Sequence, residues 1–317
     1  MADYKVLFVT DMHASERCFR KFLNAAQVYG CQVLIMGGDM TGKMLVPVVD
    51  HGGGRWSTSV FGRRRDFEAA ELPAIHKLIG DGGYYAYETT EGGVKELEAS
   101  PDAVDALFRK RITETMHRWL ALADERLKGT DVLCYMAPGN DDPPFVDDLL
   151  RDSSRVINPD GRLVELPGGF QMISVGYSNI TPWDTPREKS EAELLDLIEH
   201  EAAKVTDPTR AIFNLHVPPK DTPIDQAIQL DADLRPVIKD GMPAITGVGS
   251  SAVRTSIERH QPMLALHGHV HESRGEARIG RTVCLNPGSE YGEGVLRGVI
   301  ISLSDKRGLK GYQFVAG

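Results

Sequence analysis

Residues 263–271 read Met-Leu-Ala-Leu-His-Gly-His-Val-His, an apolar run that ends abruptly in histidine. The run is short and is therefore most simply a buried β-strand. The imidazoles of His269 and His271 follow this strand at positions i and i+2, where they have little use in packing. The stretch predicts a strand whose carboxyl end carries a chemical site.

Four earlier apolar runs end in the same way. Strand patterns cover 6–9, 33–36, 132–136 and 211–215. The polar residues that follow them in turn are Asp11 with His13, Asp39, Asn140 with Asp141 and Asp142, and His216. The strand ends of an open α/β sheet converge on one crevice, so we expect these side chains to form one site.

Each of these polar residues also has a simpler explanation. Asp11 or Asp39 alone is more often a helix N-cap or a turn residue than a ligand. Asn140 alone is typical of a turn, and His216 could be an ordinary loop histidine. These explanations would have to hold repeatedly in the same strand-end context, so we favour a shared site.

The order of the blocks resembles the calcineurin-like metallophosphoesterases. Their pattern is Asp-x-His, Gly-Asp, Gly-Asn-His-Asp/Glu, a lone His and Gly-His-x-His, and this chain follows it between residues 6 and 271. The resemblance implies two metal ions. One would be held by Asp11, His13, Asp39 and His271, and the other by Asp39, Asn140, His216 and His269. Asp39 would then bridge the two ions.

The implied cofactor is a pair of divalent transition-metal ions. Mixed imidazole, carboxylate and amide ligands suit manganese, iron, zinc, nickel or cobalt, and they argue against calcium, which prefers oxygen ligands. We expect manganese first. Two ions about 3.5–4 Å apart clamp the attacking and leaving oxygens of a phosphoryl displacement, in which a bridging hydroxide attacks.

One position departs from the family pattern. Asp141 stands where the family has histidine, and Asp142 takes the place of the usual acid. The missing imidazole would protonate the leaving oxygen and stabilise charge. Two carboxylates would repel a dianionic monoester more than a singly charged diester. The departure favours phosphodiester hydrolysis, unless Asp141 merely caps a short helix near Pro143.

The candidate catalytic residues are Asp141, Asp142 and Lys43. Lys43 could supply positive charge in place of the missing imidazole, although a lone lysine after a turn is usually solvated. The favoured function is a phosphodiesterase that acts on a small or nucleotide-like substrate. The alternatives are a phosphomonoesterase or pyrophosphatase, a nuclease for short single strands, and a non-catalytic metal-binding scaffold, which would not need all seven ligands.

Composition agrees with a soluble enzyme. The chain has 317 residues, 41% of them hydrophobic, and a net charge of -9. This balance disfavours long nucleic acid and anionic membranes as partners. The four cysteines are widely spaced, as free thiols would be. With no basic leader and no apolar stretch of about 18 residues, the chain is expected in the cytoplasm.

The expected fold is α/β, a four-layer α-β-β-α sandwich of two mixed sheets that spans residues 1–317. Helical periodicity follows Ser15, runs through 107–127 and follows the capping box of Ser190 and Glu193. Antiparallel hairpins are expected over 156–176. Late strands at 281–285, 297–303 and 311–315 are expected to complete the second sheet.

Residues 43–100 do not fit this core pattern. Apolar runs at 46–49 and 56–61 flank a glycine-rich turn, as in a hairpin. We expect an inserted cap over the metal crevice, and a homo-oligomer could form through it. In a later loop, Asn179, Thr181 and Arg187 could line the substrate pocket.

Overall fold

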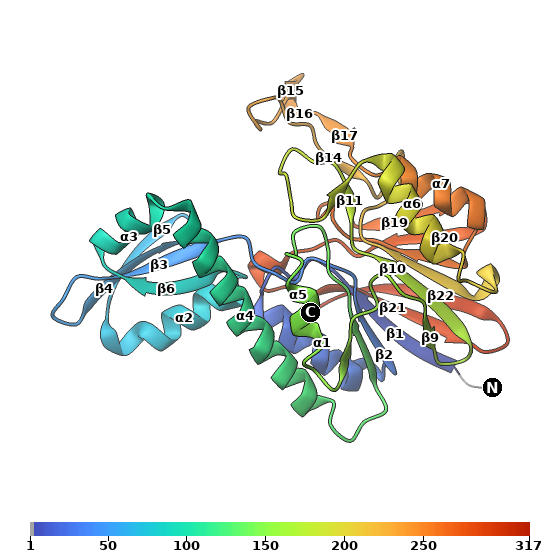
Figure 1. Ribbon diagram of the computed structural model, residues 1–317, viewed down its shortest axis with the longest axis horizontal. Helices are drawn as coiled ribbons and strands as arrows, with labels where there is room; N and C mark the ends of the chain where they lie inside the picture. Colours follow the sequence, from blue (N-terminus) through green and yellow to red (C-terminus); the bar gives the residue numbers. More distant parts are fainter. Residues whose placement is uncertain (1–2) are drawn as a thin grey trace.

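The structure is a computed structural model that describes residues 3–317 as a mixed α/β fold with several mixed sheets (Figure 1). One six-stranded sheet has the order β22 (Gly308–Ala316), β21 (Arg297–Ser304), β1 (Asp3–Val9), β2 (Val33–Met36), β7 (Leu133–Met136) and β8 (Val156–Ile157). The other has the order β19 (Gly275–Ile279), β20 (Thr282–Asn286), β18 (Leu264–Leu266), β13 (Ala211–Leu215), β10 (Phe170–Val175) and β9 (Val164–Leu166).

The five strands that the sequence predicted to end in polar residues are confirmed as β1, β2, β7, β13 and β18. Strands β1, β2 and β7 are parallel neighbours in the first sheet, and β13 and β18 are parallel neighbours in the second. Parallel strands end on the same side of a sheet. The residues after these strands are therefore gathered at one edge of each sheet.

The expected place of the late strands was partly wrong. Of the three, only β20 lies in the second sheet, where it pairs with β18. Strand β21 instead runs antiparallel to β1, with Phe8 opposite Val299, and β22 pairs with β21. Likewise, β9 and β10 form an antiparallel pair as expected, but β8 pairs in parallel with β7. Which strands pair with one another therefore depends on residues that are distant in the sequence.

The expected helices are confirmed, and their ends have local causes. Helix α1 (Glu16–Tyr29) begins where the Ser15 side chain accepts a hydrogen bond from Cys18 N, and it ends at Gly30 with φ of 64°. Helix α6 (Glu191–Ala202) begins at a capping box of Ser190 and Glu193. The others in the main body are α4 (Pro101–Arg126), α5 (Val146–Leu150) and α7 (Ser251–His260).

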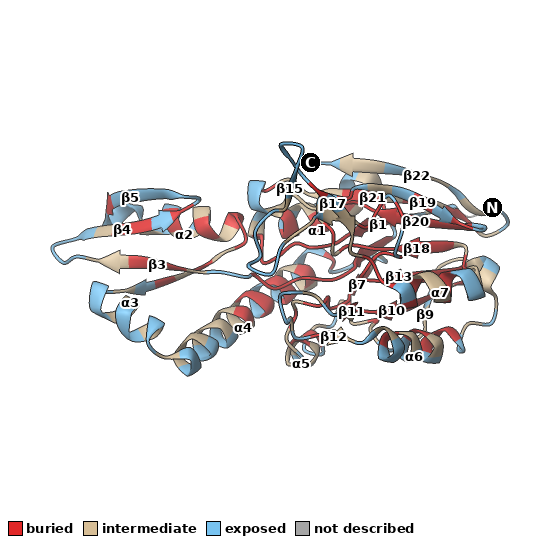
Figure 2. Ribbon diagram, turned by 90° about the horizontal axis from the view of Figure 1, so that it is seen from above, coloured by how far each residue is buried: buried red, intermediate tan, exposed pale blue. Residues whose placement is uncertain are grey.

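Three clusters of buried apolar side chains hold the main body together. The first joins α1 and α4 to the first sheet, and Phe19 stacks on Trp119 within it. The second combines both large sheets, with Phe8 of β1 and Ile212 of β13 among its members. The third joins α6 and α7 to the second sheet. Figure 2 shows the buried residues concentrated in the strands of both sheets.

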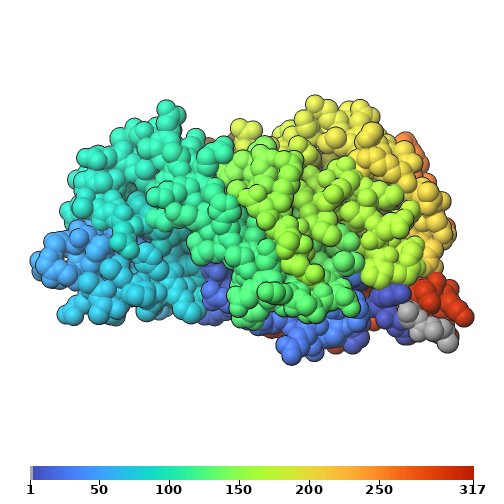
Figure 3. Space-filling model, turned by 60° about the horizontal axis from the view of Figure 1, so that its bottom comes forward, coloured from blue at the N-terminus to red at the C-terminus, as the bar shows by residue number. Residues whose placement is uncertain are grey.

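Residues 45–98 form a separate lobe with its own small core. Its sheet has the order β5 (Arg63–Glu68), β4 (Arg55–Val60), β3 (Leu45–Asp50) and β6 (Tyr85–Thr89), and its helices are α2 (Leu72–Asp81) and α3 (Glu91–Glu98). Strands β3 and β4 are the expected hairpin. Val46, Val48 and Ile79 are buried in this core. Figures 1 and 3 show the lobe at one end of the molecule.

The sequence did not predict a second segment that projects from the main body. Strands β14 (Gln226–Ile228) and β17 (Ile245–Gly247) pair as the base of an arm, and β15 (Ile238–Lys239) and β16 (Met242–Pro243) pair near its tip. It projects beyond the body in Figure 1, near β11 (Ser178–Asn179). Strand β11 pairs with β12 (Glu188–Lys189). Short 3-10 helices cover Ala69–Glu71, Pro208–Arg210 and Tyr291–Glu293.

None of the helices between residues 3 and 317 is both long enough and apolar enough to cross a lipid bilayer.

Candidate metal centre

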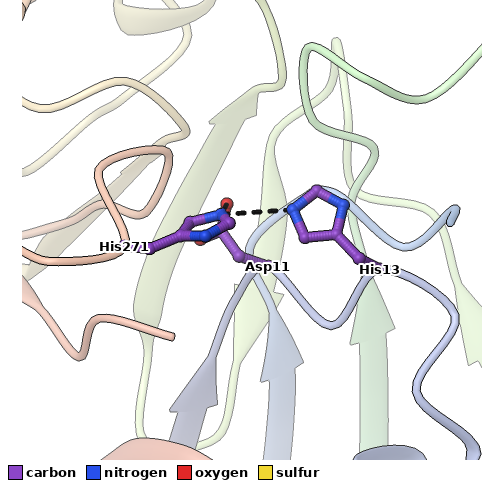
Figure 4. Close-up of side chains that lie close together, drawn as sticks. All are labelled: Asp11, His13 and His271. Atoms are coloured by element: carbon purple, nitrogen blue, oxygen red, sulfur yellow. Dashed lines mark hydrogen bonds and ion pairs between the residues drawn. The ribbon is translucent and has the colours of Figure 1, made fainter. Parts of the chain in front are cut away.

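One group of predicted ligands comes from β1 and β18. The Nε2 atoms of His13 and His271 lie 3.2 Å apart, and His271 Nε2 is 3.3 Å from Asp11 Oδ1 (Figure 4). Asp11 and His13 are buried, whereas His271 is partly open to solvent. Three donor atoms therefore face a common point.

A second group comes from β7, β13 and β18. Asn140 Oδ1 lies 3.0 Å from His216 Nε2 and 2.7 Å from His269 Nδ1. His216 and Asn140 are buried, and the rings of His216 and His269 meet edge to face. This amide oxygen and these two imidazoles also converge.

Asp39, at the end of β2, lies between the two groups. Its Oδ2 is 3.6 Å from His13 Nε2, in the first group. Its Oδ1 is 3.5 Å from His216 Nε2, in the second. The carboxylate is buried, so each oxygen is directed at a different group of donors.

The backbone at these ligands is held in an unusual conformation. Asp11, His13, Asp39 and His269 all have positive φ, between 41° and 66°. Residues other than glycine rarely adopt this region, and such strain concentrates at functional sites. No local pattern in the sequence could have revealed it, because the tertiary contacts of the strand ends impose it.

Glycines beside the ligands allow this close approach. Gly38 has φ of 140°, and a side chain there would collide with the His216 ring. A side chain at Gly139 would collide with Asp39. The Gly-Asp and Gly-Asn pairs of the sequence are thus required by the packing of the strand ends.

The imidazoles are oriented for metal binding. His13 Nδ1 lies 3.1 Å from the carbonyl of Thr41, and His216 Nδ1 lies 3.2 Å from the carbonyl of Gly37. A carbonyl can only accept, so each Nδ1 donates and each Nε2 is left to face the site. His267 also directs Nδ1 at a backbone carbonyl, that of Leu215, but this residue lies outside both groups of donors.

The charge state of Asp39 also suits a cation. Burial opposes its negative charge, but His216 and His13 hold the pKa of its carboxyl well below the usual value. Clusters within reach of one ion are Asp11 with His13 and His271, Asp11 with Asp39 and His216, and His13 with Asp39 and Asp141. Buried nitrogen and oxygen donors that face one another fit divalent transition metals.

The comparison with known proteins found a relative by sequence and solved structures of similar fold. No protein-family model matches the chain. The uncharacterized protein MJ1162 of Methanocaldococcus jannaschii is 32% identical over 160 residues, which are 50% of this chain and 63% of that protein. The crystal structure of TT1561 from Thermus thermophilus superposes with a TM-score of 0.55 at 11% identity, over 99% of both chains. Another solved chain reaches 0.56 at 15% identity, over 100% of this chain and 99% of that one.

The chain therefore shares the fold of these two solved structures. This likeness in fold agrees with the resemblance that the sequence blocks indicated.

Asp141 is the residue that departs from the sequence pattern of the calcineurin-like metallophosphoesterases. Its carboxylate pairs with Lys43, and its backbone N–H donates to Asp39 Oδ1 at 3.0 Å. Helix α5 begins at Val146 with Phe145 as its N-cap and has no side-chain cap, so the helix-capping alternative for Asp141 is wrong. Burial and the charge of Asp39 raise the pKa of Asp141 to about 7, although Lys43 opposes them.

Asp142 has a different environment. Its carboxylate is buried and accepts hydrogen bonds from the backbone N–H groups of Met40 at 3.0 Å, Thr41 at 2.8 Å and Gly139 at 2.8 Å. It thereby ties the turn after β2 to the turn after β7. An acid in this position holds Asp39 and Asn140 at a fixed separation.

A pocket of about 1,040 Å³ adjoins the metal centre. Asp39, His269 and His271 line it, and so do Lys43 and Asp141. Its walls come from residues 179–185 and from both strands at the base of the arm, and its lining includes no residue between 44 and 100. The role of the inserted lobe as a cap stays a prediction.

Of the three loop residues expected at the pocket, two are there. Asn179 and Thr181 line it, but Arg187 is 2% exposed and is not part of the lining. Arg187 Nε donates to the carbonyl of Asp142 at 2.7 Å, and its backbone N–H donates to the carbonyl of Asn140 at 3.0 Å. Sequence reasoning missed the apolar wall of Ile180, Trp183 and Ile228, because these residues stand apart in the sequence and form no apolar run.

Proposed function

We propose that the chain is a metal-dependent phosphoester hydrolase with two metal ions, most active on phosphodiesters. The observation that carries this proposal is the position of Asp39, whose two carboxylate oxygens are directed at two separate donor groups. A non-catalytic scaffold would have no need of a carboxylate shared in this way. The fold supports the same assignment.

We propose the ligand sets that the resemblance implied, and the two groups of donors support them. One set is Asp11, His13, Asp39 and His271, and the other is Asp39, Asn140, His216 and His269. Divalent ions in these sets, with manganese the first candidate, would neutralise phosphoryl charge and supply a nucleophile at neutral pH. The chain orients the imidazoles through backbone carbonyls and holds the ligand-bearing turns together through Asp142.

The preference for diesters is supported by the charges that face the pocket. Lys43 is the cation nearest Asp141, the residue that departs from the family pattern, and its ammonium is already paired with the Asp141 carboxylate. Asp141 and Glu272 add carboxylates to the same pocket lining. A dianionic monoester is repelled more strongly by these groups than a diester with a single charge. We propose a positioning role for Asp142 and direct contact with substrate for Lys43 and Asp141.

Two structural proposals accompany this function. The three apolar clusters support the four-layer α-β-β-α order, because helices pack on one face of each sheet and the sheets pack on each other. The lobe is attached beside the site, where the Tyr85 hydroxyl accepts a hydrogen bond from Gly42 N at 2.8 Å. That attachment supports a cap role for residues 43–100.

A turnover screen tests the proposed function. Purified protein would be supplied with manganese, iron, zinc, nickel or cobalt, and assayed on aryl phosphodiesters, aryl phosphomonoesters, pyrophosphate and cyclic nucleotides. We expect metal-dependent hydrolysis, with diesters preferred. A preference for monoesters or pyrophosphate would replace the diester assignment. Tightly bound metal without turnover of any substrate would favour the scaffold alternative.

The variant Asp141→His should shift activity from diesters toward monoesters. Histidine would remove a negative charge that faces the phosphoryl group, and it would supply a proton to a poor leaving group. We expect the monoester-to-diester ratio of kcat/KM to rise by about tenfold, which needs only about 1.4 kcal/mol of differential transition-state stabilisation.

The measurement uses a monoester and a methyl diester that share one aryl leaving group. Asp141→Asn is the matched control, because it removes the charge without adding an imidazole. An unchanged ratio in Asp141→His with both metals bound would show that Asp141 does not determine the preference.

A further inference from the structure

Exposed apolar side chains gather beside the metal centre. Among residues 3–317, eleven large hydrophobic side chains are exposed, and seven of them lie in the segments 180–183 and 228–245. Scattered exposed hydrophobic residues are normal, whereas a cluster marks a surface that binds something apolar. These two segments belong to the loop after β11 and to the arm, which lie near each other in Figure 1.

Three of these side chains line the pocket of the metal centre itself. Ile180 is 64% exposed, Trp183 is 59% exposed and Ile228 is 41% exposed, and all three share the pocket with Asp39. The apolar wall is therefore continuous with the place where the phosphoryl group would be held. A substrate held at the metal centre would therefore lie against this wall, and the shared pocket favours the substrate as its occupant.

The arrangement of the apolar side chains indicates which chemical group is attached to the phosphate of the substrate. A nucleobase would be held by stacking on Trp183, but two of the three side chains in the wall are aliphatic. Further exposed apolar side chains lie on the arm, where Ile238, Met242 and Ile245 are 59%, 71% and 58% exposed. One flat ring could not cover both the wall and the arm, whereas a flexible chain could.

We propose that the substrate is a phosphodiester with a long alkyl or acyl chain, and that this chain lies against Ile180, Trp183 and Ile228. This inference rests on the proposed phosphoesterase function and adds the class of substrate. The side-chain oxygen of Asn179 in the same wall is buried and accepts no hydrogen bond from the described residues. It would accept one from a hydroxyl or amide group that links the chain to the phosphate.

The test uses 4-nitrophenyl phosphodiesters that differ only in the second ester group: methyl, butyl, octyl or a nucleoside. All are kept below the concentration at which micelles form. We expect kcat/KM to rise about tenfold from methyl to octyl, a change equal to about 1.4 kcal/mol, which the burial of two methylene groups supplies. The nucleoside ester should be hydrolysed more slowly than the octyl ester.

Variants locate the effect in the wall. The double variant I180S/I228S should lower the octyl-to-methyl ratio to below about threefold, because serine removes the apolar contact. Val28→Ser, at an exposed apolar position on α1, is the control and should keep the wild-type ratio. A double variant that keeps the wild-type ratio would overturn the assignment of the wall.

Two further outcomes separate this inference from the proposed function. An active enzyme with equal kcat/KM along the alkyl series, or with a preference for the nucleoside ester, overturns the inference and leaves the hydrolase in place. If no ester is turned over, the proposed function fails, and calorimetric titration of the metal-loaded protein with octylphosphonate and methylphosphonate decides the inference. Octylphosphonate should bind about tenfold more tightly, and equal affinities would overturn the proposal.

Discussion

Replacing Asp39 with alanine is expected to remove both metal ions and to lower kcat/KM by more than about 100-fold. The two oxygens of Asp39 are directed at His13 in one group and at His216 in the other, so its loss removes coordination from both sites at once. Loss of an outer-shell partner already costs about 10- to 100-fold in metal affinity or activity. The loss of a ligand that both ions share should lower metal affinity and activity by more.

The measurement is elemental analysis of purified variants, together with turnover of an aryl phosphodiester. His13→Ala should lose chiefly one ion per chain, since His13 belongs to the first group alone. Asp105→Ala removes an exposed carboxylate on α4 and serves as the control. Two tightly bound ions per chain in Asp39→Ala would contradict the bridging role.

Arg187→Met is expected to lower the free energy of unfolding by about 3 kcal/mol. The guanidinium is buried, donates to Asp147 at 2.8 Å and lies 3.7 Å from Asp160. Removal of one partner of a buried ion pair costs about 3–5 kcal/mol, because the remaining charge is left without compensation. Asp147 is 28% exposed, which places the expected loss at the lower end of that range.

The loss caused by Arg187→Met should also depend on pH. Burial raises the pKa of Asp160 to about 6, although Gly176 N–H and Arg187 oppose it, so the folded protein binds this proton more tightly than the unfolded chain does. Stability therefore falls as pH rises from about 4 to about 6. Without Arg187 the pKa of Asp160 rises further, and the deficit should be larger at pH 8 than at pH 5.

Urea unfolding at the two pH values measures both effects. Arg151→Met removes an exposed arginine and should change stability by less than about 0.5 kcal/mol. Adding Asp160→Asn to Arg187→Met should recover part of the loss, since it removes an uncompensated charge but keeps an acceptor for Gly176 N–H. A deficit that is equal at both pH values would show that Asp160 does not respond to Arg187.

The sequence by itself determined the local elements and the order of the candidate ligands. Apolar runs predicted the strands that end before Asp11, Asp39 and His216, because burial of a short run depends on its own composition. The first residues of α1 and α6 were predicted from Ser15 and Ser190, whose hydroxyls accept hydrogen bonds from N–H groups of the first helical turn. Such interactions join neighbours in the chain, so the sequence displays them directly.

Only the tertiary structure decided how these pieces meet. The pairing of β21 with β1, the N–H groups of Met40 and Thr41 that donate to Asp142, and the hydrogen bond from Arg187 to Asp142 all join residues far apart in the chain. The apolar wall of the pocket likewise combines Trp183 with Ile228. No local pattern encodes such pairs, because each depends on which distant backbone groups and surfaces the complete fold leaves to be satisfied.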